Sequence, residues 1–283
     1  MRAAPPVVSG GGLPYRPCVS LIDRFDLNRG EMPFLEHLEE LRWRILWSLI
    51  ALVAGTIVGF VLVSHFDVLR LLIRPIRPYL GGEKLKYLSP AEPFFVTLKL
   101  ALTAGILLAF PVIAYQIWSF VSPALKPKEK RTIIPFLYFG LLLFLAGMSL
   151  AYFAVLPMAL RFFMGFLQES LEQNITVGPY LGLVVKLLLG FGLIFETPVI
   201  MLILGTLGIV RSEMLRSTRR YAVAVIFVVA AVMTPPDVFS QCMMAVPLLL
   251  LYELSIWLVR WTEGKRELSD EEEGAGGHPQ TAG

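Results

Sequence analysis

Charged residues are scarce in this sequence. Asp, Glu, Lys and Arg make up 17% of the 283 residues, whereas a soluble domain carries about 25%. The apolar share is 56%, and it falls in long blocks. This composition excludes an ordinary soluble enzyme and a disordered chain. It predicts an integral membrane protein.

Cysteines and catalytic motifs are also lacking. Cys18 and Cys242 are the two cysteines, and we expect them in different compartments, which excludes a disulfide framework. The sequence has no His-Glu-x-x-His, Gly-x-Ser-x-Gly or Walker motif, and no histidine lies deep in an apolar segment. We therefore expect no enzyme, no catalytic residues, no cofactor and no metal. No cleavable signal peptide precedes the first apolar segment, so this segment should remain as an anchor.

Six segments are apolar enough to be predicted as membrane spans, each of which needs about 20 residues. They comprise residues 45–66, 94–120, 133–156, 180–207, 221–234 and 238–259. The fifth provides only about 21 Å of helix against a hydrocarbon core of about 30 Å. We therefore expect an all-α, polytopic fold with six transmembrane helices and short fifth and sixth spans. Pro235, Pro236 and Asp237 form a tight hairpin between these two, in which Asp237 is expected to cap the sixth helix.

The distribution of basic residues predicts the orientation of the chain. Seventeen of the 25 Lys and Arg residues lie in the N-terminal segment, the loops after the second and fourth spans, and the tail. By the positive-inside rule, both termini are cytoplasmic. Five basic residues between positions 70 and 86 go against this rule, and their segment is expected to form a short amphipathic cap over the outer face. Residues 1–32 are predicted as a disordered extension, 33–262 as the membrane domain and 263–283 as a disordered acidic tail.

Ionisable residues inside membrane spans are rare and mark functional sites. Lys99, Lys186 and Glu253 lie near the ends of spans, where long side chains reach the interface. Glu196 lies about 24 Å into the fourth span. It is followed by Pro198, which removes a backbone hydrogen bond and permits a bend. Glu196 is therefore either a protonated structural residue between helices or a solvated functional group.

The segment before the first span carries acidic residues on an amphipathic helix. Apolar residues at 34, 35, 38, 41 and 45 form a helical stripe. This helix is expected to lie along the interface and turn into the first span. Its polar face offers Glu36, Glu39 and Glu40. A simpler alternative is that Glu40 and Arg44 form an i,i+4 ion pair that contributes about 0.2–0.5 kcal/mol.

Six motifs, in order and across every span, resemble the TatC family, the multispanning subunit of the twin-arginine protein translocase. They are FLEHLEELRWR at residues 34–44, LSPAEPF at 88–94, YQIWSFVSPAL at 115–125, FGLIFETPV at 191–199, LGIV at 207–210 and MTPPDVFSQ at 233–241. Together they cover about residues 33–261. Trp43, Pro127 and Glu39 depart from the usual family pattern.

The resemblance implies a receptor for folded proteins whose signal peptides carry two adjacent arginines. In the family, two acidic residues receive these arginines, and they correspond here to Glu40 and Glu129. A carboxylate pairs bidentately with guanidinium in a geometry that Lys cannot reproduce. The resemblance assigns Gln116 and Phe120 to the same surface, where Arg42 and Arg44 either orient Glu40 or anchor the helix.

The resemblance also implies an assembly in the bacterial inner membrane. It places Glu196 on the concave, water-accessible face of a glove-like bundle, in contact with a polar residue of a single-span partner. The expected partners are A-type and B-type Tat subunits in a hetero-oligomer with several copies, signal peptides and membrane lipids, but no nucleic acid. Export would be driven by the proton-motive force. The alternative is a proton- or ion-coupled solute transporter using Glu196, but Glu196 has few polar neighbours in its span and no inverted repeat is visible.

Overall fold

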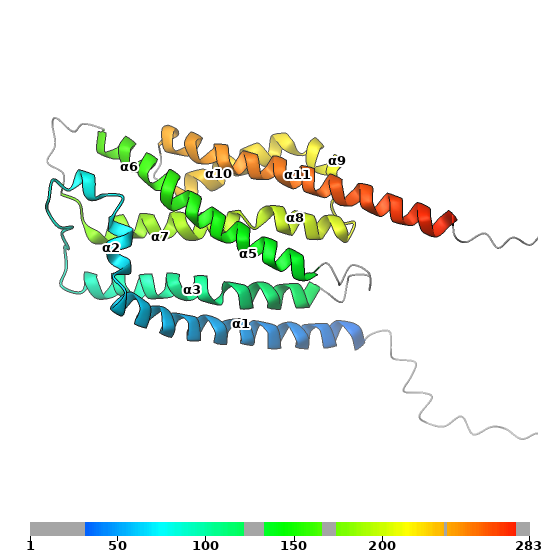
Figure 1. Ribbon diagram of the computed structural model, residues 1–283, viewed down its shortest axis with the longest axis horizontal. Coiled ribbons are helices and arrows are strands. Elements are labelled where there is room, and N and C mark those ends of the chain that lie inside the picture. Colours follow the sequence, from blue (N-terminus) through cyan, green and yellow to red (C-terminus); the bar gives the residue numbers. More distant parts are fainter. Residues whose placement is uncertain (1–31, 122–132, 166–173, 235–236, 276–283) are drawn as a thin grey trace, which may run out of the picture. The chain divides into compact units, whose positions relative to one another are not determined.

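The computed structural model describes residues 32–121, 133–165, 174–234 and 237–275 (Figure 1). It divides between Trp43 and Arg44 into two units. Within the described residues every regular element is a helix, and one isolated bridge pairs Lys86 with Thr176. The all-α prediction is confirmed.

Five helical segments of the described chain are long and apolar enough to cross a membrane. They are α1 (Met32–His65); α3 (Glu92–Val121); α5 (Ile133–Leu150), continued by the π-helix η4 (Ala151–Val155) and α6 (Leu156–Gly165); α7 (Val177–Ile194), continued by α8 (Thr197–Thr206); and α11 (Val238–Ala275). Because a helix satisfies nearly all of its backbone hydrogen bonds internally, such segments suit a membrane interior, which offers no hydrogen-bond partners.

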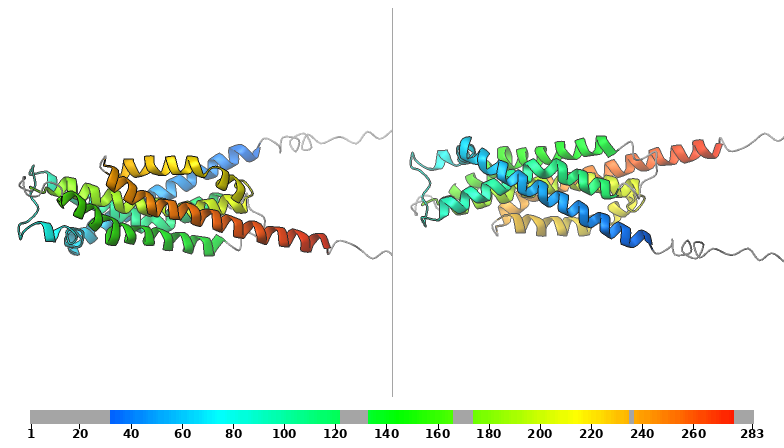
Figure 2. Two further views of the ribbon diagram at one scale, coloured as in Figure 1. Left: turned by 90° about the horizontal axis from the view of Figure 1, so that it is seen from above. Right: turned by 90° about the horizontal axis from the view of Figure 1, so that it is seen from below.

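The predicted fifth span is a helix, but a short one. It corresponds to α10 (Arg219–Met233), whose 15 residues extend only about 22 Å. The count of six membrane-spanning helices is therefore not confirmed. α10 and α11 lie side by side (Figure 2), and Gln241 Nε2 on α11 donates a 2.9 Å hydrogen bond to the Phe227 carbonyl on α10.

The predictions for the sixth span and the tail need correction. α11 has 38 residues and is the longest helix among those described, so the sixth helix is not short. It runs through Ala275, and residues 263–275, expected to be disordered, are helical. The charge density after residue 259 ends the apolar span, but Glu, Lys, Arg and Leu are all good helix formers. No proline occurs between Pro247 and Pro279 to stop the helix.

The third predicted span also extends further than expected. We expected it to end at residue 156, but helical structure continues to Gly165. Pro157 cannot donate a backbone hydrogen bond, which disfavours a regular α-helix. The π-helical turn η4 lies directly before it, and such turns change the hydrogen-bond register within a helix. The chain therefore passes the proline without leaving the helix.

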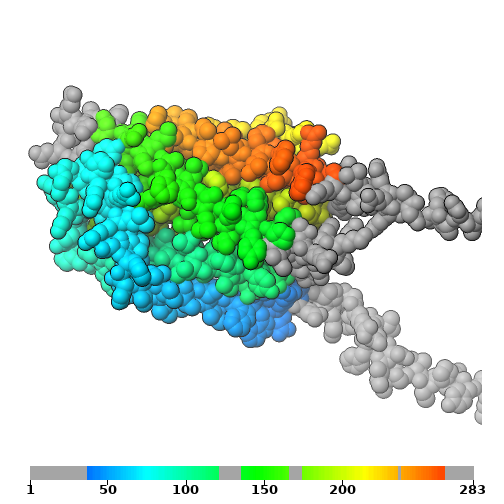
Figure 3. Space-filling view, in the orientation of Figure 1, coloured from blue at the N-terminus to red at the C-terminus, as the bar shows by residue number. Residues whose placement is uncertain are grey.

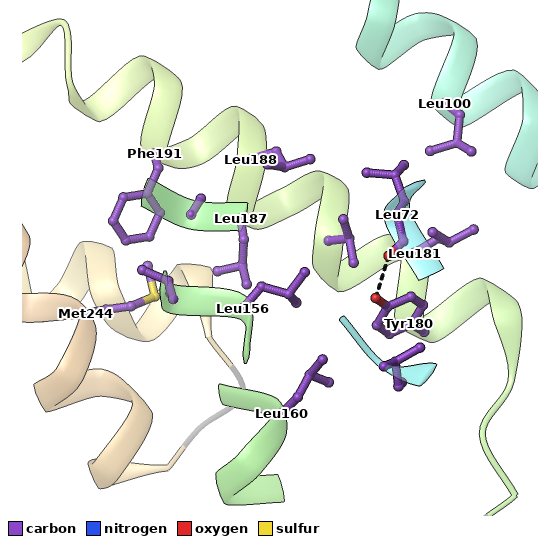
Figure 4. Close-up of a cluster of buried hydrophobic side chains, with 14 of the residues drawn as sticks. Leu72, Leu100, Leu156, Leu160, Tyr180, Leu181, Leu187, Leu188, Phe191 and Met244 are labelled. Atoms are coloured by element: carbon purple, nitrogen blue, oxygen red, sulfur yellow. Dashed lines mark hydrogen bonds between the residues drawn. The ribbon is translucent and has the colours of Figure 1, made fainter. Parts of the chain in front are cut away.

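A cap covers one end of the bundle, as the sequence predicted. It contains α2 (Val68–Ile73) and η2 (Arg77–Tyr79), and we call the end where residues 66–91 lie the cap end (Figure 3, cyan). Leu72 is buried in the main apolar cluster, and the Tyr180 hydroxyl donates a 2.6 Å hydrogen bond to its carbonyl (Figure 4). The Tyr152 hydroxyl donates a similar 2.6 Å bond to the carbonyl of Leu71.

The buried cluster joins helices that are far apart in sequence. Its members include residues of α2, α3, α6, α7 and α11, namely Leu72, Leu100, Leu156, Leu160, Leu187, Phe191 and Met244 (Figure 4). α1 crosses α3 (Figure 2), and glycines allow their close approach: a Cβ atom on Gly55 would lie 2.7 Å from the Gly105 carbonyl oxygen. Small residues commonly line such crossings in membranes.

Candidate functional site

The predicted arginine-binding helix is the first part of α1. We expected an interfacial helix that turns into the first span, but α1 is uninterrupted from Met32 to His65. No glycine or proline lies between Pro33 and Gly55 to break it. Glu36, Glu39 and Glu40 therefore lie on a continuous helix rather than on a separate segment.

Glu40 is accessible within the N-terminal unit. Its Oε2 atom lies 3.5 Å from His37 Nδ1, one turn earlier, and the two side chains are 35% and 44% exposed respectively. Arg42 is exposed. Arg44 is half-buried, and its carbonyl accepts a 2.9 Å hydrogen bond from the Ser48 hydroxyl.

Gln116 and Phe120 lie in the last turns of α3, and both are half-buried. Between them Trp118 is buried against Phe136 of α5, with ring centroids 5.7 Å apart. This packing fixes the rotation of α3 about its axis, which leaves Gln116 and Phe120 on the flanks of the packed face. Glu129 lies outside the described residues.

Glu196 occupies a break between two helices of one span. α7 ends at Ile194, and α8 begins at Thr197 with Pro198 in its first turn. Pro198 has no N–H to offer the carbonyl of residue 194, which is why the regular ladder stops there. The predicted effect of Pro198 on the fourth span is confirmed. Glu196 itself stands at the N-cap position of α8 but makes no side-chain capping bond.

The carboxyl group of Glu196 points at a glycine of the neighbouring helix. A Cβ atom on Gly140 of α5 would lie 3.0 Å from Oε2 and 3.6 Å from Oε1. Among the described residues Oε1 is buried without a hydrogen-bond partner. The sequence analysis does not single out Gly140, although it is one of only two glycines among the 18 residues of α5.

The other ionisable residues of the spans lie elsewhere. Lys99 and Lys186 are exposed. Glu253 Oε2 accepts a 2.8 Å hydrogen bond from Arg219 Nη2, which joins α11 to the start of α10. Within the described ranges no three His, Cys, Asp or Glu residues gather where they could hold a metal ion.

The hairpin before α11 contains the expected capping residue. Asp237 Oδ1 accepts a 2.7 Å hydrogen bond from the Ser240 backbone N–H, the geometry of a helix N-cap. Pro235 and Pro236 lie outside the described residues.

Comparison with known proteins identifies the family. A family model described as "Sec-independent protein translocase protein (TatC)" matches residues 36–247. The chain belongs to the TatC family. It is therefore similar to components of a protein translocase, and the solute-transporter alternative is not favoured.

Individual TatC proteins match over most of their length. The TatC protein of Desulforapulum autotrophicum is 41% identical over 245 residues, which cover 86% of this chain and 89% of the relative. The TatC protein of Aquifex aeolicus is 41% identical over 239 residues, which cover 83% of this chain and 98% of the relative. A solved structure described as a twin-arginine translocase receptor, TatC, superimposes with a TM-score of 0.72 at 41% identity and covers 80% of this chain and 98% of its own.

Proposed function

We propose that this TatC protein is the receptor for twin-arginine signal peptides in a translocase that exports folded proteins. The observation that carries the proposal is an accessible carboxylate, Glu40, on the motif that resembles the family's arginine-binding signature. A similar protein of known structure is described as a translocase receptor, which supports the same role here.

Glu40 and Glu129 receive the two arginines in this proposal. The exposed fraction of Glu40 lets a guanidinium approach, and its neighbour His37 is a weaker partner that an arginine can replace. Gln116, Phe120, Arg42 and Arg44 contribute to the same surface. The apolar part of the signal peptide then lies as a helix against the spans.

Glu196 contacts single-span partner helices in this proposal. Its half-buried side chain supports the role, because its Oε1 atom has no hydrogen-bond partner among the described residues and a polar residue of a partner helix would supply one. The partners are A-type and B-type Tat subunits in several copies, within a bacterial inner membrane and with both termini of this chain in the cytoplasm. Because the sequence has no Walker motif, the proton-motive force supplies the energy.

Signal-peptide cross-linking tests the receptor role. A precursor with a photoreactive residue beside its Arg-Arg pair is added to membranes that contain this protein and its partner subunits. We expect a single Glu40→Gln or Glu129→Gln substitution to reduce cross-linking roughly tenfold, since each removes a charge-assisted pair. A Lys-Lys precursor should be similarly poor.

Two matched variants control for general loss of charge. Glu39→Gln changes the exposed neighbour of Glu40, and Glu213→Gln changes an exposed carboxylate on α9 (Ser212–Ser217). Both should cross-link like the unmodified protein. Equal cross-linking of the Arg-Arg and Lys-Lys precursors would contradict the proposal.

A further inference from the structure

The basic residues of the cap end are not explained by the orientation of the chain. Five of them lie between positions 70 and 86, on the side of the membrane where few are expected. Arg70 pairs with Asp67 at 3.2 Å, and Lys86 pairs with Glu83 at 3.2 Å. Arg74, Arg77 and Lys84 make no ion pair with any residue that the structure describes.

A cavity of about 1070 Å³ lies among these residues. Its walls come from the last turn of α1, the cap and the first turns of α3. The apolar side chains that line it include Val63, Leu69, Ile73, Leu85, Val96 and Leu100. Arg70, Arg77, Lys84 and Glu83 also line it, and the cap that carries them covers this end of the molecule (Figure 3).

The cavity spans the boundary between a polar and an apolar layer. Its lining on α3 runs from Pro93, next to the helix start, to Leu100, which is about 10 Å along the helix. Leu100 lies inside a stretch of α3 that is apolar enough to cross a membrane, whereas the basic residues belong to the cap, outside any such stretch. We therefore expect the α3 lining to reach hydrocarbon and the basic residues to lie near the headgroups. The cavity volume is slightly above the usual range for small-molecule sites, about 300–1,000 Å³.

The hydroxyl groups that line the cavity already donate hydrogen bonds to backbone carbonyls of their own helices. The Ser64 hydroxyl donates to the Phe60 carbonyl at 2.7 Å, and the Thr97 hydroxyl donates to the Pro93 carbonyl at 2.9 Å. An extended peptide needs partners for its own backbone groups, and this lining offers few. A hydrocarbon chain needs none.

We propose that this cavity binds one anionic phospholipid of the leaflet at the cap end. Arg77 and Lys84 hold the phosphate and headgroup, and one acyl chain lies along Val96 and Leu100. Each basic group that reaches the headgroup from the cavity lining should strengthen binding of an anionic lipid about fivefold. The proposal gives the excess of basic residues at the cap end a function, which the receptor role does not.

Native mass spectrometry of the purified full-length protein tests the site. The protein is mixed with equal amounts of phosphatidylglycerol and phosphatidylethanolamine, and the lipid retained after detergent removal is counted. We expect one phosphatidylglycerol to be retained preferentially. The double variant Arg77→Gln/Lys84→Gln should reduce its retention about 25-fold, from two factors of about five, whereas Arg74→Gln, an exposed cap residue outside the cavity lining, should leave retention unchanged.

A second substitution tests the acyl-chain part of the site. Thr97→Trp fills the cavity from α3 and should abolish retention of either lipid; Ser64→Trp does the same from α1 if the first variant fails to fold. Excess inorganic phosphate should not displace the lipid, because the ion cannot fill the apolar lining. Equal retention of the two lipids, retention by both tryptophan variants, or displacement by phosphate would each overturn the proposal.

Discussion

The carboxyl group of Glu196 lies against Gly140, because a Cβ atom at residue 140 would be only 3.0 Å from Oε2. The space for this carboxyl between α5 and α8 therefore exists because residue 140 has no side chain. The two residues are 56 positions apart in the sequence, yet they lie against each other in the fold.

A side chain at residue 140 should act on Glu196. Gly140→Leu is expected to push the carboxyl group out of its position and lower cross-linking between partner helices and residues beside Glu196, to the level of Glu196→Gln. Gly140→Ala should have a smaller effect, since the carboxyl is the end of a flexible side chain. Gly165→Leu is the control, because nothing lies within 4 Å of a Cβ atom there. Unchanged cross-linking in Gly140→Leu would rule out this coupling.

Glu92 should stabilise the cap end through both its oxygens. Oε1 accepts a 2.8 Å hydrogen bond from the Gly178 N–H, and Oε2 accepts a 2.6 Å bond from the Leu88 N–H. Glu92→Gln replaces one acceptor by a donor that faces an N–H group, and we expect the free energy of unfolding in detergent to fall by about 1–3 kcal/mol. Glu83→Gln, which loses an exposed ion pair with Lys86, should cost at most about 1 kcal/mol. A similar fall in the free energy of unfolding in Glu92→Gln and Glu83→Gln would contradict the stabilising role of Glu92.

Two tyrosines should hold α2 in place. Tyr180 is only 5% exposed, so Tyr180→Phe removes a hydroxyl and leaves the Leu72 carbonyl without this 2.6 Å bond. We expect Tyr152→Phe/Tyr180→Phe to lower stability by about 1–3 kcal/mol and to speed hydrogen exchange in residues 68–73. The control is Tyr87→Phe, which changes an exposed residue of the cap end. If hydrogen exchange in residues 68–73 is as slow in the double variant as in Tyr87→Phe, the two hydroxyls do not hold α2.

Asp237 should stabilise the start of α11. Asp237→Ala removes the 2.7 Å capping bond to Ser240, and we expect a loss of about 0.5–2 kcal/mol in thermal or denaturant unfolding. Asp67 occupies the N-cap position of α2 without a side-chain capping bond, so Asp67→Ala should cost less. An equal loss of stability in Asp237→Ala and Asp67→Ala would show that the hydrogen bond from Ser240 to Asp237 does not stabilise α11.

The sequence predicted the features that depend on neighbouring residues. The apolar runs located the long helices, Pro198 marked the helix break, and Asp237 marked the start of α11. Each of these signals acts through hydrogen bonds within a few positions of the chain. The helices reach Gly165 and Ala275, beyond the predicted span ends at residues 156 and 259, because a π turn before Pro157 and strong helix formers after residue 259 allow the helix to continue.

The site was only partly predictable, for a related reason. The sequence singles out Glu196 because a charge inside a span is costly. The role of Gly140 depends on the packing of α5 against α8, which no local pattern shows. The family resemblance assigned Glu40 and Glu129, and composition alone would have made Glu40 an ordinary surface residue. Long-range packing determines such pairs, and a single sequence does not contain that information in a local pattern.

α11 extends beyond its apolar stretch as a continuous helix, so a label at its end would lie at a known distance from that stretch. The stretch of α11 that is long and apolar enough to cross a membrane reaches Gly264, and the helix continues to Ala275, which carries the chain about 16 Å further along the helix axis. A fluorophore attached at Ala275 would thus stand at a fixed offset from the end of the span. If the proposed receptor role holds, energy transfer from this position to a labelled precursor would report the distance between the bound precursor and the end of α11.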